Sequence, residues 1–216
     1  MLSARRPLLV LGTRDFSYEI AELAEETGEF EVTGFVENLS RERVGGTLEG
    51  RPIHWIDDID AFAATHLAVC GIGTTRRRVL AEEAASHGLR FATVVHPSSR
   101  VPASATLGEG TIVSAGVVVG TRASLGRHVF LNRGALVGHH TALADYVSVM
   151  PGANIAGFCT VEEAAYVAMG AVVVDRVTVG SGSVVGAGAV VVHDVPARVQ
   201  VTGLPARVVK EGIEAR

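Results

Sequence analysis

The chain has 216 residues, 48% of them hydrophobic, and its 19 Lys and Arg against 23 Asp and Glu give a net charge of −4. This length allows one large domain or two small ones, and the acidic balance argues against a nucleic-acid partner, whose phosphates need a basic face. Aromatic residues make up only 5% of the chain while Gly numbers 25, so the core must be filled by Val, Ala and Leu in narrow, repeated layers.

Neither a membrane span nor a cleaved signal peptide is expected. The sequence holds no apolar stretch of about 18 residues or more, and Gly12, Arg14 and Asp15 interrupt its first apolar run. The two cysteines, Cys70 and Cys159, lie inside apolar runs. This usage excludes a disulfide framework and favours a cytoplasmic location.

The first part of the chain alternates short apolar runs with helical patterns. The apolar runs predict strands, and the helical spacing predicts helices between them. The expected strands are 7–12, 30–38, 51–56, 66–73 and 90–96, and the expected helices are 16–28, one near 58–64, and 74–88. This order predicts an α/β domain over residues 1–97, with a small parallel, Rossmann-like sheet covered by helices.

The second part of the chain follows a six-residue period. Every sixth residue from Val101 to Val191 is Val, Leu or Ile, and every sixth residue from Ala105 to Val195 is small or β-branched. We interpret each hexad as one flat side of a three-sided β-solenoid, so that three hexads, or 18 residues, complete a coil. The aliphatic residues then stack into a continuous internal column, which explains the scarcity of aromatic residues.

This hexad pattern resembles the left-handed parallel β-helix of the hexapeptide-repeat acyltransferases. The resemblance covers residues 101–196 of a predicted helix domain over residues 98–200. The following tail, 201–216, begins with VTGLPARVVK, which resembles the G-x-P-A-[KR] segment of that family. An α/β domain before such a helix further resembles the sugar N- or O-acetyltransferases of the PglD/NeuD type. The resemblance implies a homotrimer with acetyl-CoA sites in the clefts between neighbouring helices.

Acyl transfer from a thioester to an amine or hydroxyl needs a base that takes the proton of the attacking group. His139 follows the inward Val137 by two residues, so its side chain should project outward. The resemblance places His139 at the family's catalytic base. The family carries an acidic residue next to it, where this chain has His140, which we expect in a supporting or substrate-facing role. Asp145 is the candidate substitute for the missing carboxylate.

The resemblance also implies a site for acetyl-CoA. Ser148 aligns with a second family histidine near the thioester, and Gly157 aligns with a position whose N–H approaches the thioester. On the facing subunit we expect the pantetheine arm to border Met169 and Ala187. The tail charges are candidate partners of the CoA phosphates, and they are Arg207 and Lys210.

In the α/β domain, the family holds a nucleotide-sugar with a glycine-rich turn after the first strand and an acidic pair after the second. Here Gly12 begins the turn, and Arg14 supplies charge where backbone N–H groups would otherwise hold a phosphate. Glu37 and Asn38 stand in place of the acidic pair. These four residues are the predicted acceptor site.

Three alternatives stay open at the level of sequence. The acceptor could be another small molecule, or the helix could be a trimeric scaffold without catalysis. The γ-class carbonic anhydrases, which resemble this fold, bind zinc through a H-x4-H pair and a third histidine, but the predicted helix contains no H-x4-H. We therefore expect no metal, and an acyltransferase that uses acetyl-CoA.

Overall fold

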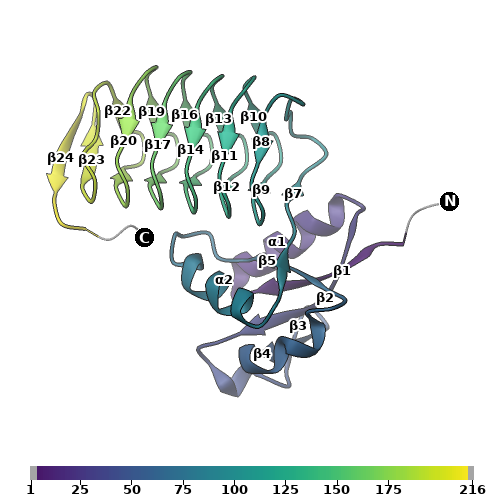
Figure 1. Cartoon of the computed structure of the whole chain (residues 1–216). Helices are drawn as coiled ribbons and strands as arrows, with labels where there is room; N and C mark the ends of the chain where they lie inside the picture. Colours follow the sequence, from purple (N-terminus) through teal and green to yellow (C-terminus); the bar gives the residue numbers. More distant parts are fainter. Residues whose placement is uncertain (1–3, 214–216) are drawn as a thin grey trace. The chain divides into compact units, whose positions relative to one another are not determined.

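The computed structural model describes residues 4–213, so the outer ends of the predicted first domain and tail, 1–3 and 214–216, lie outside the described residues. The chain divides into two compact units, one ending at Pro97 and the other beginning at Ser98, and each is described here by itself (Figure 1). Within residues 4–213 no helix has the length and apolarity that crossing a membrane requires.

The first unit is built on a six-stranded sheet whose central strand β1 is buried from Leu8 to Leu11. Its strands are β1 (Arg6–Leu11), β2 (Phe30–Glu37), β3 (Thr47–Leu48), β4 (Arg51–Trp55), β5 (Leu67–Cys70) and β6 (Arg90–Phe91). They lie in the order β3-β4-β2-β1-β5-β6, parallel except for the β3–β4 pair. The apolar run of β1 is what a strand covered on both faces requires.

Helices connect the parallel strands of this sheet, as the alternating pattern predicts. Helix α1 (Asp15–Glu26) follows β1, and α2 (Arg77–Ser86) follows β5. Short 3-10 helices cover Arg41–Arg43 and Ile56–Phe62. The second of these replaces the helix expected near 58–64. Its two buried residues, Ile56 and Ile59, are three positions apart, which suits the three-residue turn of a 3-10 helix.

The strand expected over 90–96 is wrong as a single element. It forms β6 and, after a break, β7 (Val94–Val95). The ladder between β5 and β6 pairs only Leu67 with Arg90 and Ala68 with Phe91. The chain therefore leaves the sheet although its sequence remains apolar.

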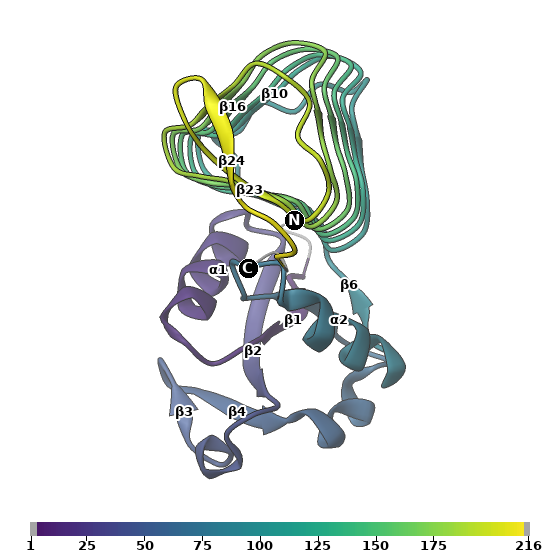
Figure 2. The same ribbon diagram turned by 90° about the vertical axis from the view of Figure 1, so that its left-hand side faces the viewer.

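The second unit is a parallel β-helix with three flat faces, and Figure 2 shows its stacked coils in a triangular outline. The first face contains β10 (Val118–Val119), β13 (Leu136–Val137), β16 (Asn154–Ile155), β19 (Val172–Val173) and β22 (Val190–Val191). The second face contains β8 (Thr106–Leu107), β11 (Ser124–Leu125), β14 (Ala142–Leu143), β17 (Thr160–Val161) and β20 (Thr178–Val179). The third face contains β9 (Ile112–Val113), β12 (Phe130–Leu131), β15 (Ser148–Val149), β18 (Tyr166–Val167), β21 (Val184–Val185), β23 (Gln200–Gly203) and β24 (Ala206–Lys210).

The strand register confirms the 18-residue coil. On the first face Val119 pairs with Val137, which pairs with Ile155 in the next coil. Every sixth residue from Val113 to Val191 is buried, so these residues form the predicted internal column. Burial of aliphatic side chains in this column is the main source of stability for the helix.

The hexad step ends near Val191, and here the expected pattern is wrong in detail. Val195, assigned to the small-residue series, pairs with Val179 of the aliphatic series, so the last coil is shorter than the others. In the earlier coil the N–H of Thr160 donates to a backbone carbonyl. At the equivalent place the N–H of Thr178 donates instead to the Asp194 carboxylate at 2.7 Å. The side chain thus replaces the backbone acceptor. The segment predicted as a tail continues the third face of the helix. Its strand β23 pairs with β21, and β24 is the antiparallel partner of β23.

Candidate active site

His139 lies at a corner of the helix, between β13 and β14. Corners from successive coils stack into an edge, which we call the histidine edge, and backbone bonds join its coils: the N–H of Phe158 donates to the His139 carbonyl at 3.0 Å, and that of Arg176 to the Gly157 carbonyl at 3.1 Å. The His139 side chain is exposed. It therefore projects outward, as its position two residues after Val137 predicts.

The His139 ring lies over Gly157, and this contact requires glycine. A Cβ at position 157 would lie 2.8 Å from both Cε1 and Nε2 of His139, and 3.2 Å from its Nδ1. The two distances of 2.8 Å are shorter than real Cβ contacts, so a side chain at 157 would displace the imidazole from this position. The missing side chain of Gly157 thus makes room for the imidazole, and its predicted approach to a thioester stays a prediction.

His140 and Phe158 complete the cluster on the histidine edge. The two Nδ1 atoms of His139 and His140 are 3.1 Å apart. The Phe158 ring stacks on His140, with centroids 4.8 Å apart and planes at 16°, and it meets the His139 ring edge to face at 5.0 Å. The guanidinium of Arg176 lies 4.7 Å from the Phe158 centroid. Sequence reasoning missed Phe158, although it follows His140 by one coil.

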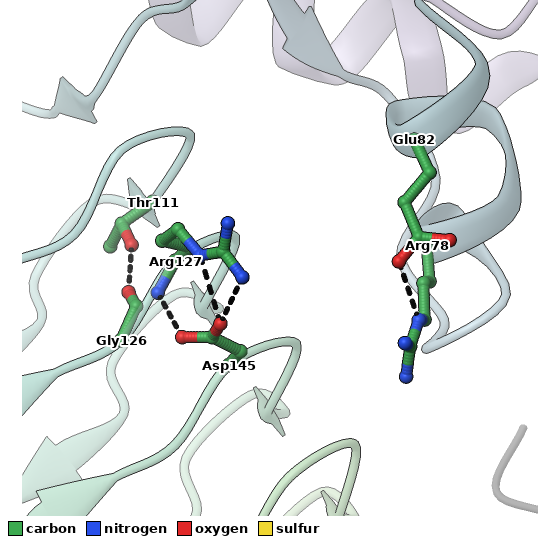
Figure 3. Close-up of polar contacts among 6 residues, drawn as sticks. All are labelled: Arg78, Glu82, Thr111, Gly126, Arg127 and Asp145. Carbon is green, nitrogen blue, oxygen red and sulfur yellow. Dashed lines mark hydrogen bonds and ion pairs between the residues drawn. The ribbon is translucent and has the colours of Figure 1, made fainter. Parts of the chain in front are cut away.

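Asp145 lies at the next corner along the chain, on a different edge from His139. Its carboxylate accepts from the N–H of Arg127 at 2.7 Å, and from the Nε and Nη2 of the same residue at 2.9 and 2.8 Å (Figure 3). Burial raises the pKa of Asp145, but these bonds and the Arg127 charge outweigh it and hold the pKa below its usual value. Both carboxylate oxygens are engaged by Arg127. The expectation that Asp145 replaces the acidic neighbour of His139 is therefore not supported by the geometry.

Apart from Gly157 on the histidine edge, the residues predicted to contact acetyl-CoA lie in three other places. Ser148 is fully buried in β15, away from the histidine edge. Met169 and Ala187 share another edge, where the N–H of Gly188 donates to the Met169 carbonyl at 3.0 Å, and the Met169 side chain is 57% exposed. No single chain brings these residues to His139.

Arg207 and Lys210 are exposed residues of β24. Arg207 borders a cavity of about 230 Å³ that β24 forms with the last, shortened coil. His193 and Asp194 also line this cavity. The cavity is lined by side chains of both charges, which is compatible with a polar ligand group. Of the two cations predicted to contact the CoA phosphates, Arg207 is the one that lines this cavity.

In the first unit, the four predicted acceptor residues all line one cavity of about 180 Å³. It lies where β1, β2 and β5 end, the edge of a parallel sheet at which α/β proteins bind ligands. Gly12 adopts φ +111°, and a Cβ there would lie 2.7 Å from the Ser17 hydroxyl oxygen. The close passage of the turn over α1 therefore requires glycine at position 12.

The Glu37 carboxylate is held by the loop around it. Its Oε1 accepts from the N–H groups of Asn38, Leu39 and Ser40 at 2.9, 2.8 and 3.3 Å, and its Oε2 accepts from the Thr13 hydroxyl. Burial raises the pKa of Glu37, but these four hydrogen bonds outweigh it and lower the pKa below its ordinary value. Glu37 thus shapes the cavity wall with its acceptors already satisfied.

Of the other residues that line this cavity, the sequence analysis predicted Asn38 and Arg14 but missed a second glycine turn. The Asn38 amide donates to Glu83 at 2.8 Å, while Arg14 lines the cavity with its side chain exposed. A second glycine turn, Gly71-Ile72-Gly73, also lines it and was missed. The signal was available, because Gly71 and Gly73 stand at the end of the predicted strand 66–73, which the structure ends earlier, at Cys70. Among residues 4–213, no group of three or more His, Cys, Asp or Glu side chains could hold a metal ion.

Comparison with solved structures places this architecture in a known family. A histidine variant of perosamine N-acetyltransferase from Caulobacter crescentus, in complex with CoA and GDP-perosamine, has 30% identity and a TM-score of 0.86, and the match covers 95% of this chain and 97% of that one. The acetyltransferase domain of PglB from Neisseria gonorrhoeae, in complex with acetyl coenzyme A, has 31% identity and a TM-score of 0.87, with 95% and 100% covered. WeeI from Acinetobacter baumannii matches at 25% identity and a TM-score of 0.85, with 94% and 100% covered.

No family model and no curated protein matches the sequence. The structural matches nevertheless define the class, an α/β domain followed by a left-handed parallel β-helix, and they confirm the predicted fold class. Within that class, the chain belongs to the hexapeptide-repeat sugar N-acetyltransferases of the PglD type.

Proposed function

We propose that the protein transfers the acetyl group of acetyl-CoA to the amine of a nucleotide-linked amino sugar, with His139 as the general base. The observation that carries this proposal is the His139 imidazole, exposed and lying over Gly157, in a chain that matches an enzyme solved with CoA and GDP-perosamine over 95% of its length. The comparison with N-acetyltransferases favours an amine over a hydroxyl acceptor.

The chemistry follows from the position of the ring. The sugar amine forms an amide bond as the thioester C–S bond breaks, and CoA is released as the thiol. His139 takes the proton that the attacking nitrogen must lose. Its Nδ1 faces His140, so Nε2 is the nitrogen left to accept this proton. Acetyl-CoA supplies the activated acyl group, and holding both reactants beside the ring supplies much of the acceleration.

The cavity of the first unit is the proposed site of the nucleotide part. The turn from Gly12 to Phe16 lines it at the start of α1, where backbone N–H groups and the helix dipole favour a phosphate. Arg14 adds a positive charge beside them. Because the Glu37 carboxylate already accepts four hydrogen bonds, we assign it to holding the loop and leave contact with the acceptor to Arg14 and Asn38.

A homotrimer through the first face would complete the transferase site. The outward residues of this face include the exposed Val118 and Leu136, whereas the second face presents Thr106, Ser124 and Thr160. The first face is bounded on one side by the Met169 edge and on the other by the histidine edge. Packing first faces around a threefold axis therefore brings His139 of one protomer toward Met169 and Ala187 of the next.

The other assignments are consistent with this proposal. Arg207 and Lys210 of β24 are the proposed partners of the CoA phosphates, whereas the buried Ser148 is a poorer candidate for direct contact with the thioester.

Both cysteines are free and buried, and burial raises the pKa of the Cys70 thiol to about 11. Such unreactive thiols fit a reducing cytoplasm, which is the proposed location.

A thiol-release assay with acetyl-CoA tests the proposal. GDP-perosamine and a panel of UDP- and dTDP-linked amino sugars serve as acceptors. We expect turnover with at least one of them, and His139→Ala should lower kcat by roughly 10²- to 10⁴-fold, the usual contribution of general base catalysis. His66→Ala, a histidine of the first unit, is the matched control and should keep wild-type turnover. Wild-type turnover by His139→Ala would refute the mechanism.

A ligand-binding measurement separates the enzyme from the non-catalytic scaffold. Acetyl-CoA at millimolar concentration should raise the melting temperature of the wild-type protein, because it binds the folded state only. His139→Ala should show a similar rise, since the base contributes to the reaction rather than to cofactor binding. Absence of any shift in the wild-type protein would favour the scaffold.

A further inference from the structure

The hydrogen bond between the Nδ1 atoms of His139 and His140 contains a single proton, which belongs to one of the two rings. Their Nδ1 atoms are 3.1 Å apart, which is hydrogen-bond distance, and a bond between two imidazole nitrogens needs one protonated nitrogen and one bare nitrogen. In neutral imidazole the proton sits on only one of the two ring nitrogens. The side on which this proton lies therefore decides whether Nε2 of His139 is free to act as a base.

The proposed role of His139 as the base, together with the orientation of its ring, selects one of the two arrangements. Its Cε1–Nε2 side lies over Gly157, while Nδ1 points to His140. A base working through Nε2 must carry its own proton on Nδ1. If His140 donated instead, the proton of His139 would sit on Nε2, and the ring could not accept one from the amine.

We propose that His140 is a positioning residue whose bare Nδ1 accepts the Nδ1–H of His139 and so keeps Nε2 of His139 unprotonated. This inference rests on the proposed function of His139. His140 thereby performs the orienting task for which the sequence suggested Asp145, and it does so as a neutral acceptor.

Phe158 fixes the geometry of this pair. It stacks on His140 at 4.8 Å and meets His139 edge to face at 5.0 Å, with the Arg176 guanidinium 4.7 Å from its own ring centre. The stack leaves His140 little freedom to rotate away.

A neutral acceptor has a consequence for the pH dependence. A carboxylate beside an imidazole favours the protonated ring, whereas a neutral imidazole does not. The charged groups on the histidine edge are Arg176, which contacts Phe158, Asp175, whose Oδ2 lies 3.6 Å from the Arg176 Nε, and Arg122, one coil before His140. None of the hydrogen bonds described above joins them to His139. A carboxylate introduced at position 140 should therefore favour the protonated base, which the His140→Asp variant tests.

The variants follow from the backbone at this corner. His140 adopts φ +57°, a conformation that Gly and Asn accept readily, and the equivalent corners at 134, 152 and 170 are glycine. His140→Gly removes the acceptor without strain, and His140→Asn restores an acceptor oxygen near the place of Nδ1. Ala164→Gly, at a corner with φ +56° on another edge, is the control for backbone relief alone.

Nitrogen NMR of 15N-histidine-labelled protein, at mildly alkaline pH without ligands, tests the tautomer directly. His139→Ala assigns the signals. We expect His139 to carry its proton on Nδ1 in the wild-type protein, in His140→Asn and in Ala164→Gly, and to shift toward the Nε2–H form in His140→Gly. A wild-type His139 protonated on Nε2, or a tautomer unchanged in His140→Gly, would overturn the proposal whether or not an acceptor is known.

Kinetics with the active acceptor give the second measurement. His140→Gly should lower kcat roughly 10- to 100-fold, as misplacing a catalytic group does, with the KM for acetyl-CoA within about twofold of wild type. His140→Asn should recover most of this loss. In His140→Asp the acid limb of kcat/KM should move up by about one pH unit, because the carboxylate favours the protonated base.

These results separate the two proposals. Loss of turnover in His139→Ala together with an unchanged kcat in His140→Gly would refute the positioning role and leave the proposed function intact. Absence of turnover with every acceptor would count against the proposed function, while the NMR tautomer would still decide the role of His140.

Discussion

At the scale of single residues, Glu37 is a buried carboxylate that is closely hydrogen-bonded to the loops around it. It is 6% exposed and accepts four hydrogen bonds from the turn after β1 and the loop after β2. Arg43 joins this network by donating to the Thr13 hydroxyl at 2.8 Å. The two loops that line the acceptor cavity are thus tied together through one carboxylate.

Replacing this carboxylate should destabilise the protein in a pH-dependent way. Glu37→Gln should lower the free energy of unfolding by about 1–3 kcal/mol at neutral pH, the cost of weakened buried hydrogen bonds. The folded state depresses the pKa of Glu37 below its ordinary value near 4.5, so the unfolded chain binds the proton first as the pH falls. The stabilisation is therefore complete above about pH 4.5 and is lost as the pH falls through the folded-state value.

Urea titrations of wild type and Glu37→Gln at a series of pH values check this prediction. The difference in stability should be largest near neutral pH and should shrink below about pH 4.5. Glu31→Gln, an exposed residue of the same strand, should change stability little at any pH. A difference that stays constant into acid would mean that the carboxylate charge is not what the loop requires.

The outward direction of His139 could be predicted from sequence, because the hexad series fixes which residues point inward. The same arithmetic applied to Asp145 would have shown the error, since six residues lead to the next edge and only 18 return to the same one. That the Glu37 carboxylate already accepts four hydrogen bonds could not be predicted. It depends on how the loop 38–40 folds back, and no short pattern in the sequence records that conformation.

At the scale of elements, the β-helix depends on its internal column. Ile155 in β16 is fully buried, while its neighbour Asn154 points outward. The column is only one aliphatic residue wide per face and coil, so neighbouring residues have little scope to fill a gap.

Ile155→Ala should therefore destabilise the helix by about 2–5 kcal/mol, the range for large-to-small changes in a well-packed core. Thr160→Ala, at an outward position on the second face, should change stability by less than about 0.5 kcal/mol. Thermal unfolding followed by circular dichroism compares the two variants with wild type. Equal melting temperatures for both variants would contradict the inward assignment of the series.

The element predictions succeeded where the pattern is repetitive and failed where it stops. Sixteen aliphatic hexads share one register, so a wrong assignment at one would conflict with all the others. The split between β6 and β7 and the shortened last coil have no such support. At both places the sequence still follows its pattern. The structure changes nevertheless, because the backbone leaves the sheet after β6 and because the Asp194 carboxylate replaces a backbone acceptor in the last coil.

At the scale of the whole molecule, the proposed trimer makes the site depend on association. Leu136 is 40% exposed on the first face, and Thr160 is exposed on the second face. If first faces pack together, a charge at 136 would be buried without a partner, which is strongly unfavourable.

Leu136→Glu should convert the trimer to monomers and abolish turnover, whereas Thr160→Glu should leave both unchanged. Light scattering after size-exclusion chromatography measures the mass against a protomer of 22.5 kDa, and the thiol-release assay measures activity. A wild-type mass of one protomer, or an active monomeric Leu136→Glu, would remove the shared site from the proposal.

The 18-residue coils that precede the shortened last coil also restrict how this protein can change in length. Deleting one residue inside the helix would exchange inward and outward side chains in every later strand of that register. Duplicating a whole coil would instead keep all corners aligned and displace the carboxyl-terminal end by about 4.8 Å, one strand spacing. Insertions and deletions in descendants of this chain should therefore come as complete turns of the solenoid, with the spacing between His139 and β24 changing in fixed increments.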